Sequence, residues 1–401
     1  MDDNQLTSFL MENEELLIRW RRHLHANPEL SFEEFETAEF ISDRLTDMGY
    51  KVERGVGGTG VIATLETQRP GPVIAFRADM DALPIMESTD LPYESKKIGI
   101  MHACGHDVHM TVLLGTALVL SKAKDDFIGS VRFIFQPGEE ANGGARCIID
   151  AGALQNPTVE KIFALHVMPF IPVGQIAMKS GYMSATDDEI IIKFHGTAAH
   201  SSEPETGTNA ITMAAHAITA MQSIQTACIS PHDIATFSIC KIRGGEAINI
   251  IADTVEMSGM IRCIEKATKL KFREKIEQIC KNTALAFGGS VEIDFIEGFP
   301  AVYNDPSLNE IVEIAAKEAL SHDNVTEIKI PHLGSEDFSY YQEVIPGVMF
   351  MLGVGVTGED RGLLHTPSLN VHEDALTVGV KVFTSIARKI CGINRDTKTV
   401  E

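Results

Sequence analysis

The sequence lacks a long apolar segment: among its 401 residues no run approaches the roughly 20 apolar residues that a membrane-spanning helix needs. The amino terminus, Met1-Asp-Asp-Asn-Gln5, lacks the basic and apolar regions of a secretory signal peptide. Basic residues are few, 34 against 56 acidic ones, and the net charge of -22 argues against nucleic acid or an anionic membrane as a partner. We therefore expect a cytoplasmic protein that binds neither.

Cysteine is also sparse, and its spacing is irregular. Seven cysteines are an odd number, which favours a reducing compartment over a disulfide framework. Six of them are expected to be small core residues, namely Cys147, Cys228, Cys240, Cys263, Cys280 and Cys391.

The signatures of two other enzyme classes are missing. No Gly-x-Ser-x-Gly segment occurs, so a serine hydrolase has no candidate nucleophile. Glycine patterns occur at Gly55–Gly60 and Gly353–Gly358, but a dinucleotide-binding loop must open a helix. The first pattern runs into the strand-like Val61–Leu65 and the second into polar residues. Both are therefore interpreted as tight turns.

The densest group of reactive side chains is Met101-His-Ala-Cys-Gly-His-Asp-Val-His109. Cys104 and His106 stand on either side of Gly105, so both side chains can converge on one centre in an extended or turning backbone. A buried structural cysteine needs no histidine two residues away, whereas a thiolate bound to a metal gains from imidazole co-ligands. The pattern therefore favours a metal site over a polar loop.

Further candidate ligands each follow an apolar run. Glu139 and Glu140 come after the strand-like Ser130–Phe135, and His166 and His365 follow similar runs. Two adjacent carboxylates repel unless one binds a cation while the other transfers protons. Alone, the glutamates would fit a solvated acidic loop and each histidine a satisfied core residue. Together with the cysteine cluster they complete a ligand set.

The chain length exceeds the size at which one core stops growing, so two domains are expected. Alternating strand and helix patterns to about Gly181 predict an α/β domain, a mostly parallel sheet with helices on both faces. Between about 189 and 295 the order becomes strand-helix-strand-strand-helix-strand, the ferredoxin-like α+β plan. We therefore expect one domain at 1–182 and 298–401, and an inserted one at 183–297.

Six segments together resemble the signatures of one family of dinuclear metallohydrolases. It includes aminoacylases, hippurate hydrolases and plant auxin-conjugate hydrolases, in the superfamily of acetylornithine deacetylase and carboxypeptidase G. The segments are Arg77-Ala-Asp-Met-Asp-Ala-Leu-Pro84, His102-Ala-Cys-Gly-His-Asp107, Gln136-Pro-Gly-Glu-Glu140, Ala164-Leu-His166, Gly334-Ser-Glu-Asp-Phe338 and Leu364-His-Thr-Pro367. The resemblance runs in the family's order from about Arg21 to the last helix, nearly the whole chain.

The resemblance implies two divalent metal ions per subunit and a catalytic base, Glu139. The implied ligands are Cys104, His106, Glu140, His166 and His365. Asp79 resembles the acidic residue that orients a metal ligand, although Arg77 stands where the superfamily has a histidine. Thiolate, imidazole and carboxylate together suit Zn²⁺, and admit Mn²⁺, Co²⁺ or Ni²⁺.

The inserted domain resembles the family's lid and dimerisation domain, with a hinge at about Met183 and Glu297. His200 resembles a histidine that reaches the site of a partner subunit and stabilises the oxyanion. Asn249 and Arg262 resemble the clamp on the substrate's free carboxylate, for which a bidentate arginine is suited. The chain departs from its relatives nearby, with Ala252 for a proline and Asn209 for an aspartate.

The implied activity is metal-dependent hydrolysis of N-acyl amino acids, N-acetyl, N-benzoyl or similar, to a carboxylic acid and a free amino acid. A homodimer, or a dimer of dimers, is implied as well. Two alternatives stay open: a dipeptidase or carboxypeptidase of the same superfamily, and a metal-binding protein without catalysis. Glu139 argues against the second, since a storage site needs no carboxylate beside a ligand.

Overall fold

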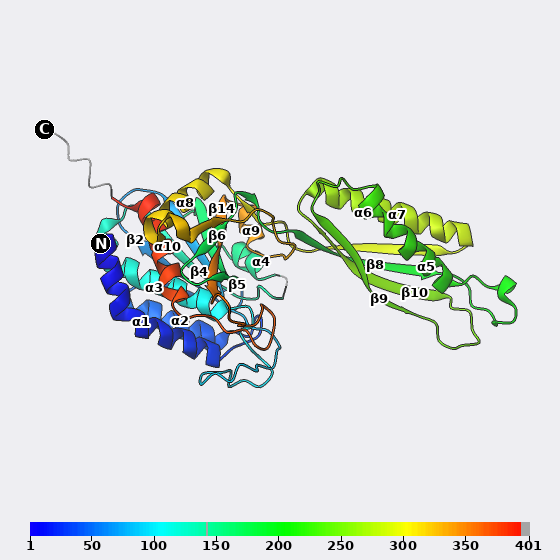
Figure 1. Cartoon of the computed structure of the whole chain (residues 1–401), viewed down its shortest axis with the longest axis horizontal. Coiled ribbons are helices and arrows are strands. Elements are labelled where there is room, and N and C mark those ends of the chain that lie inside the picture. Colours follow the sequence, from blue (N-terminus) through cyan, green and yellow to red (C-terminus); the bar gives the residue numbers. More distant parts are fainter. Residues whose placement is uncertain (142, 394–401) are drawn as a thin grey trace. The chain divides into compact units, whose positions relative to one another are not determined.

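A computed structural model describes residues 1–141 and 143–393, which fold as two compact units (Figure 1). Unit 1 comprises Met1–Met183, Tyr303–Lys329 and the chain from Asp337. Unit 2 comprises Ser184–Val302 and Ile330–Glu336. Ile330–Glu336 lies within 298–401, the part of the sequence that was expected to belong to the first domain.

Unit 1 is built on one eight-stranded sheet. In sheet order its strands are β1 (Lys51–Val56), β2 (Gly60–Glu66), β4 (Ser130–Gln136), β3 (Val73–Asp79), β5 (Lys161–Pro172), β14 (Gly347–Gly355), β6 (Ile176–Met178) and β13 (Val325–Glu327). The four central strands, β4, β3, β5 and β14, are parallel, so their carboxyl ends lie at the same edge of the sheet. The α/β prediction is confirmed.

Helices lie on both faces of this sheet. They are α1 (Asp3–Ala26), α2 (Phe35–Asp47), α3 (His106–Lys122), α4 (Gly144–Asp150), α8 (Pro306–Leu320), α9 (Ser339–Gln342) and α10 (Ala375–Cys391). Successive side chains of a strand point to opposite faces. On β3, Phe76 packs against Phe383 of α10, whereas its neighbour Arg77 binds Asp337, which also accepts a hydrogen bond from the Ala145 backbone of α4. In the described part of the chain no helix is long and apolar enough to cross a membrane.

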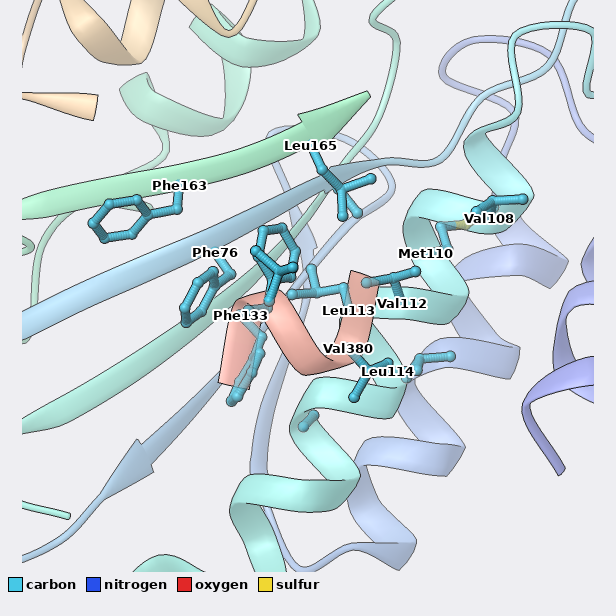
Figure 2. Close-up of a cluster of buried hydrophobic side chains, with 14 of the residues drawn as sticks. Phe76, Val108, Met110, Val112, Leu113, Leu114, Phe133, Phe163, Leu165 and Val380 are labelled. Atoms are coloured by element: carbon cyan, nitrogen blue, oxygen red, sulfur yellow. The ribbon is translucent and has the colours of Figure 1, made fainter. Parts of the chain in front are cut away.

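The core of unit 1 lies between the sheet and the helices α3 and α10. Figure 2 shows Phe76, Phe133 and Phe163 of the strands facing Leu113 of α3 and Val380 of α10, and all five side chains are buried. Burying one such side chain stabilises the fold by about 1.5 to 3 kcal/mol. The helix α3, which begins at His106, is therefore fixed against one face of the sheet.

Unit 2 has its own sheet and its own core. In chain order its elements are β8 (Thr186–His195), α5 (Ala210–Met221), α6 (Ser223–Ala227), β9 (Ala235–Gly244), β10 (Thr254–Cys263), α7 (Lys266–Phe287) and β11 (Ser290–Glu297). The sheet order β11-β8-β10-β9 is antiparallel throughout, which confirms the ferredoxin-like plan. Ile192, Phe194, Met257 and Phe272 are fully buried between sheet and helices.

The expectation that six cysteines are core residues is wrong for two of them. Cys147 on α4 and Cys240 on β9 are exposed, and Cys228 is half-buried. Both exposed cysteines lie on outward-facing sides of their elements, Cys240 on an edge strand. All seven cysteines are free thiols.

Gly105 allows α3 to begin close to β5, and this closeness can be tested. Its φ is +82°, and a Cβ on it would lie 2.4 Å from Cγ2 of the buried Val167. We expect Gly105→Ala to cost about 1 to 3 kcal/mol of unfolding free energy from crowding, in addition to about 1 to 2 kcal/mol from the left-handed backbone. The measurement is chemical denaturation.

Gly99→Ala is the matched control, because Gly99 has φ +81° with no atom within 4 Å of its Cβ position. It should show the backbone cost alone. Equal losses of stability in the two variants would contradict the close approach of α3 and β5.

Candidate metal centre

The shared carboxyl edge of the central strands gathers the predicted ligands. Because parallel strands end at the same edge, polar residues that follow them in sequence meet there. Cys104 precedes α3, His106 is its first residue, Glu140 follows β4, His166 lies in β5, and His365 follows β14. The structure brings all five together within unit 1. The His365 backbone N–H donates to Ala103 O at 2.8 Å, which ties its loop to the cysteine segment.

The ligand atoms form two overlapping groups around Cys104. Its Sγ lies 3.4 Å from His166 Nε2 and 3.3 Å from His365 Nε2. His365 Nε2 is in turn 3.2 Å from Glu140 Oε1. Cys104, His106 and His166 form one group and Cys104, Glu140 and His365 the other, and within each the ligand atoms lie within 4.8 Å of one another. This arrangement can hold two ions that share the thiolate.

His106 and His166 present the same ring nitrogen to the centre. His106 Nδ1 donates to Asp81 O, and His166 Nδ1 donates to Val167 O, both at 2.8 Å. A neutral ring that donates from Nδ1 keeps a lone pair on Nε2, the atom free to bind a metal. Backbone carbonyls therefore select the ligating nitrogen of both rings.

One buried atom of the ligand set, His106 Nε2, has no hydrogen-bond partner among the described residues. Leaving a buried polar atom unpaired costs about 1 to 3 kcal/mol. A cation bound by His106 with Cys104 and His166 would pair with this lone pair. The donor set of thiolate, imidazole and carboxylate fits a transition-metal ion in the same way.

The candidate ligands differ in how their surroundings shift their pKa values. Hydrogen bonds to the Cys104 sulfur and to the Glu140 carboxylate raise the pKa of His365 to about 10. Burial holds the pKa of His166 well below its usual range, so that ring is neutral, the form that binds metal. Burial also raises the pKa of the Cys104 thiol, so binding of an ion there would release a proton.

His109 and Asp79 lie next to this centre, but their atoms are already engaged. His109 Nδ1 donates to Asp79 Oδ1 at 2.6 Å, and its Nε2 accepts the Val167 backbone N–H at 2.9 Å. The other carboxylate oxygen of Asp79 accepts from Arg77 at 2.6 Å. Asp79 Oδ1 is 3.8 Å from His106 Nδ1, so its hydrogen bond goes to His109 instead of to a predicted ligand.

Asp79 belongs to a buried ion network that also includes Arg77 and Asp337. Arg77 also donates to Asp337 at 2.7 Å and to the Gln136 side chain at 2.8 Å, and Gln136 itself donates to Asp337. Although burial opposes ionisation, the neighbouring His106, His109 and Arg77 hold the pKa of Asp79 well below its usual range. Asp337 lies in the segment Gly334–Phe338, and the sequence alone predicted no role for it.

Asp81 is a further residue to which the sequence analysis gave no role. Its backbone carbonyl accepts from His106, and its buried carboxylate accepts the Glu140 backbone N–H at 2.9 Å and the Ser31 hydroxyl at 2.7 Å. It therefore positions two of the five candidate ligands. The only signal in the sequence is its place two residues after Asp79.

Glu139, the predicted base, is buried beside the candidate ligands. One of its carboxylate oxygens lies within 4.8 Å of ligand atoms of His106 and Glu140. A carboxylate at this distance can exchange protons with a water molecule held between the ligands.

The remaining three predicted residues lie in unit 2. His200 and Asn249 are exposed on neighbouring segments, since Ser201 N–H donates to Asn249 O at 3.0 Å. Arg262 lies near the opposite end of β10 and donates to Leu333 O at 2.9 Å. The nine residues from Thr254 to Arg262 alone span roughly 25 Å of strand. One copy of unit 2 therefore keeps Asn249 and Arg262 apart.

Comparison with known proteins places this arrangement in a family. Residues 75–389 match the model of peptidase family M20/M25/M40. The chain is 38% identical to an N-acetylcysteine deacetylase of Bacillus subtilis, with 92% of this chain and 96% of the relative covered. It is 36% identical to thermostable carboxypeptidase 2 of Saccharolobus solfataricus, with 96% and 98% covered.

A solved structure from the same family is also similar to this chain. A dinuclear metal-binding peptidase of the M20 family from Bacillus subtilis is 35% identical, superposes with a TM-score of 0.82, and covers 94% of this chain and 98% of its own. The family model spans more than half of the sequence, including every candidate ligand. The chain is a hydrolase that belongs to peptidase family M20/M25/M40.

Proposed function

We propose that this chain is a dinuclear metal-dependent amidohydrolase that cleaves N-acyl amino acids to a carboxylic acid and a free amino acid. The observation that carries the proposal is the buried Glu139 carboxylate beside the two groups of candidate ligands. The similarity to an N-acetylcysteine deacetylase supports the substrate class.

The ions would be held by Cys104, His106, Glu140, His166 and His365. When bound, they supply Lewis-acid activation of a water molecule and of the scissile carbonyl. Glu139 accepts the proton of the attacking water on its carboxylate and returns it to the nitrogen of the leaving amine. One C–N bond breaks, one C–O bond forms, and the products are a carboxylic acid and an amine. Cys104 has to stay reduced for this role, which agrees with the expected cytoplasmic location.

We propose Zn²⁺ or Mn²⁺ as the ions, with Co²⁺ or Ni²⁺ as substitutes. Imidazole and thiolate favour zinc, whereas the carboxylate also accepts manganese.

A second candidate function is hydrolysis of peptides from their carboxyl end, which the similarity to a carboxypeptidase favours. Turnover of N-acetyl, N-benzoyl and indole-acyl amino acids, compared with that of dipeptides, separates the two. N-acyl amino acids as the better substrates would support the first function, and dipeptides would support the second.

We also propose that the active assembly is a homodimer in which His200 serves the partner's site. Asn249 lies in the loop before β10 and Arg262 near the far end of that strand, so one unit 2 cannot put both on one carboxylate, whereas two copies could. The Ser202 backbone N–H donates to His200 Nδ1 at 3.2 Å, which leaves the proton on Nε2. An exposed N–H of this kind is the donor that an oxyanion needs.

The adjacent glutamates should separate catalysis from metal binding. Glu139→Gln should keep both ions and lower kcat by at least about 10² to 10⁴-fold, because base catalysis and proton return are both lost. Glu140→Gln should lose metal, because a carboxylate ligand is removed. Elemental analysis and steady-state kinetics measure both effects. A Glu139→Gln protein with more than about a tenth of wild-type kcat would contradict the role of the base.

Removal of metal should abolish activity reversibly. Dialysis against a chelator should leave an inactive protein, and added Zn²⁺ or Mn²⁺ should restore turnover. The exposed Cys147→Ser variant is a control that should reconstitute normally, whereas Cys104→Ser should not. Activity that survives exhaustive chelation would rule out the metal-dependent mechanism.

Mixing two inactive variants tests the dimer. His200→Ala and Glu139→Gln together should regain about a quarter of wild-type activity, because random exchange makes half of the dimers mixed and each mixed dimer has one intact site. Native mass spectrometry reports the exchange. Mixed dimers that stay inactive would mean that His200 serves its own subunit or only the fold.

A further inference from the structure

His109 lies in the first turn of α3, next to the candidate ligands, but it has no nitrogen left to bind a metal. The side chain is 1% exposed. Its Nδ1 donates to Asp79 at 2.6 Å and its Nε2 accepts from the Val167 backbone N–H at 2.9 Å. Both ring nitrogens are therefore used, and the tautomer is fixed by the backbone donor.

Val167, whose N–H bonds to His109, also orients His166. Val167 donates its N–H to His109 and accepts on its carbonyl from His166 Nδ1 at 2.8 Å. The two rings pack edge to face with centroids 4.8 Å apart. His109 thus contacts His166 directly and also bonds to the residue, Val167, whose carbonyl orients the His166 ring.

The sheet holds this part of β5 from one side only, where Val167 lies opposite Leu352 of β14. The pairing of β5 with β3 ends at Ala164 and Arg77, three residues before Val167. His109 accepts the Val167 N–H where no β3 residue is paired. His109 therefore supplies, on this side of β5, the backbone contact that β3 does not.

The Nδ1 side of the His109 ring is bonded to the buried ion network of Asp79, Arg77 and Asp337. Asp79 binds His109 with one carboxylate oxygen and Arg77 with the other. Arg77 is fixed in turn by Asp337 at 2.7 Å. A continuous chain of hydrogen bonds therefore runs from β3 through His109 to β5.

We propose that His109 is a positioning residue for one ion of the pair, the one held by His166, and not a ligand. The inference rests on the proposed two-ion site. Residues that orient a ligand typically contribute about 10 to 100-fold to metal affinity. Because His365 and Glu140 do not depend on Val167, the ion that they hold should be affected much less.

The test is a competition titration of the metal-free, full-length protein with Zn²⁺ and a chromophoric chelator. His109→Leu should weaken one binding step by about 10 to 100-fold and leave the other nearly unchanged. In the Co²⁺-loaded protein the absorption bands of one ion should shift. His109→Gln, whose side-chain oxygen can accept from the Val167 N–H, should recover part of the affinity. It also serves as the milder variant if His109→Leu folds poorly.

Val112→Ala is the matched control. Val112 is fully buried on the same helix and packs on Gly379 of α10, away from the ligands. It should lower the unfolding temperature while leaving both binding steps and the Co²⁺ spectrum as in the wild type.

Two outcomes overturn the inference alone: a His109→Leu protein that titrates like the wild type, or one that loses both ions equally. Wild-type protein that binds no divalent ion overturns the proposed function instead, and this inference with it.

Discussion

The Arg77 guanidinium, buried with the carboxylates of Asp79 and Asp337, is the constraint on which the site depends. Buried charges are tolerated only when each is paired and hydrogen-bonded, and here the arginine binds both carboxylates and Gln136. The network joins β3, β4 and the segment before α9 at the edge where the ligands gather. Its geometry decides where Asp79 points, and through Asp79 where His109 stands.

The site could be predicted from sequence to the extent that it depends on strand ends. Cys104, His106, Glu140, His166 and His365 each stand beside an apolar run or a glycine, and parallel strands end at one edge. The sequence could not show that both ring nitrogens of His109 are already hydrogen-bonded. His109 is excluded as a ligand by the backbone N–H of Val167, which belongs to a distant strand.

The fold was predictable where the pattern is periodic. Alternation in the strands of unit 2 predicts the ferredoxin-like order, because one face of each strand is buried against the helices. The segment Ile330–Glu336 has no such pattern. It joins unit 2 through contacts such as the hydrogen bond from the Ala185 N–H to Gly334 O. Every residue type except proline can donate such a backbone hydrogen bond, so the residue types do not predict it.

The pair of short strands β7 (Gly181–Tyr182) and β12 (Tyr303–Asn304) has a consequence for how the chain folds. Tyr182 pairs with Tyr303 and Gly181 with Asn304, so the polypeptide leaves unit 1 and returns to it at adjacent positions. Bringing together the ends of a long disordered loop costs entropy that grows with its length. If unit 2 forms first, the stretch that separates β7 from β12 acts as a short connection. Unit 1 can then assemble its sheet almost as if the insertion were a turn.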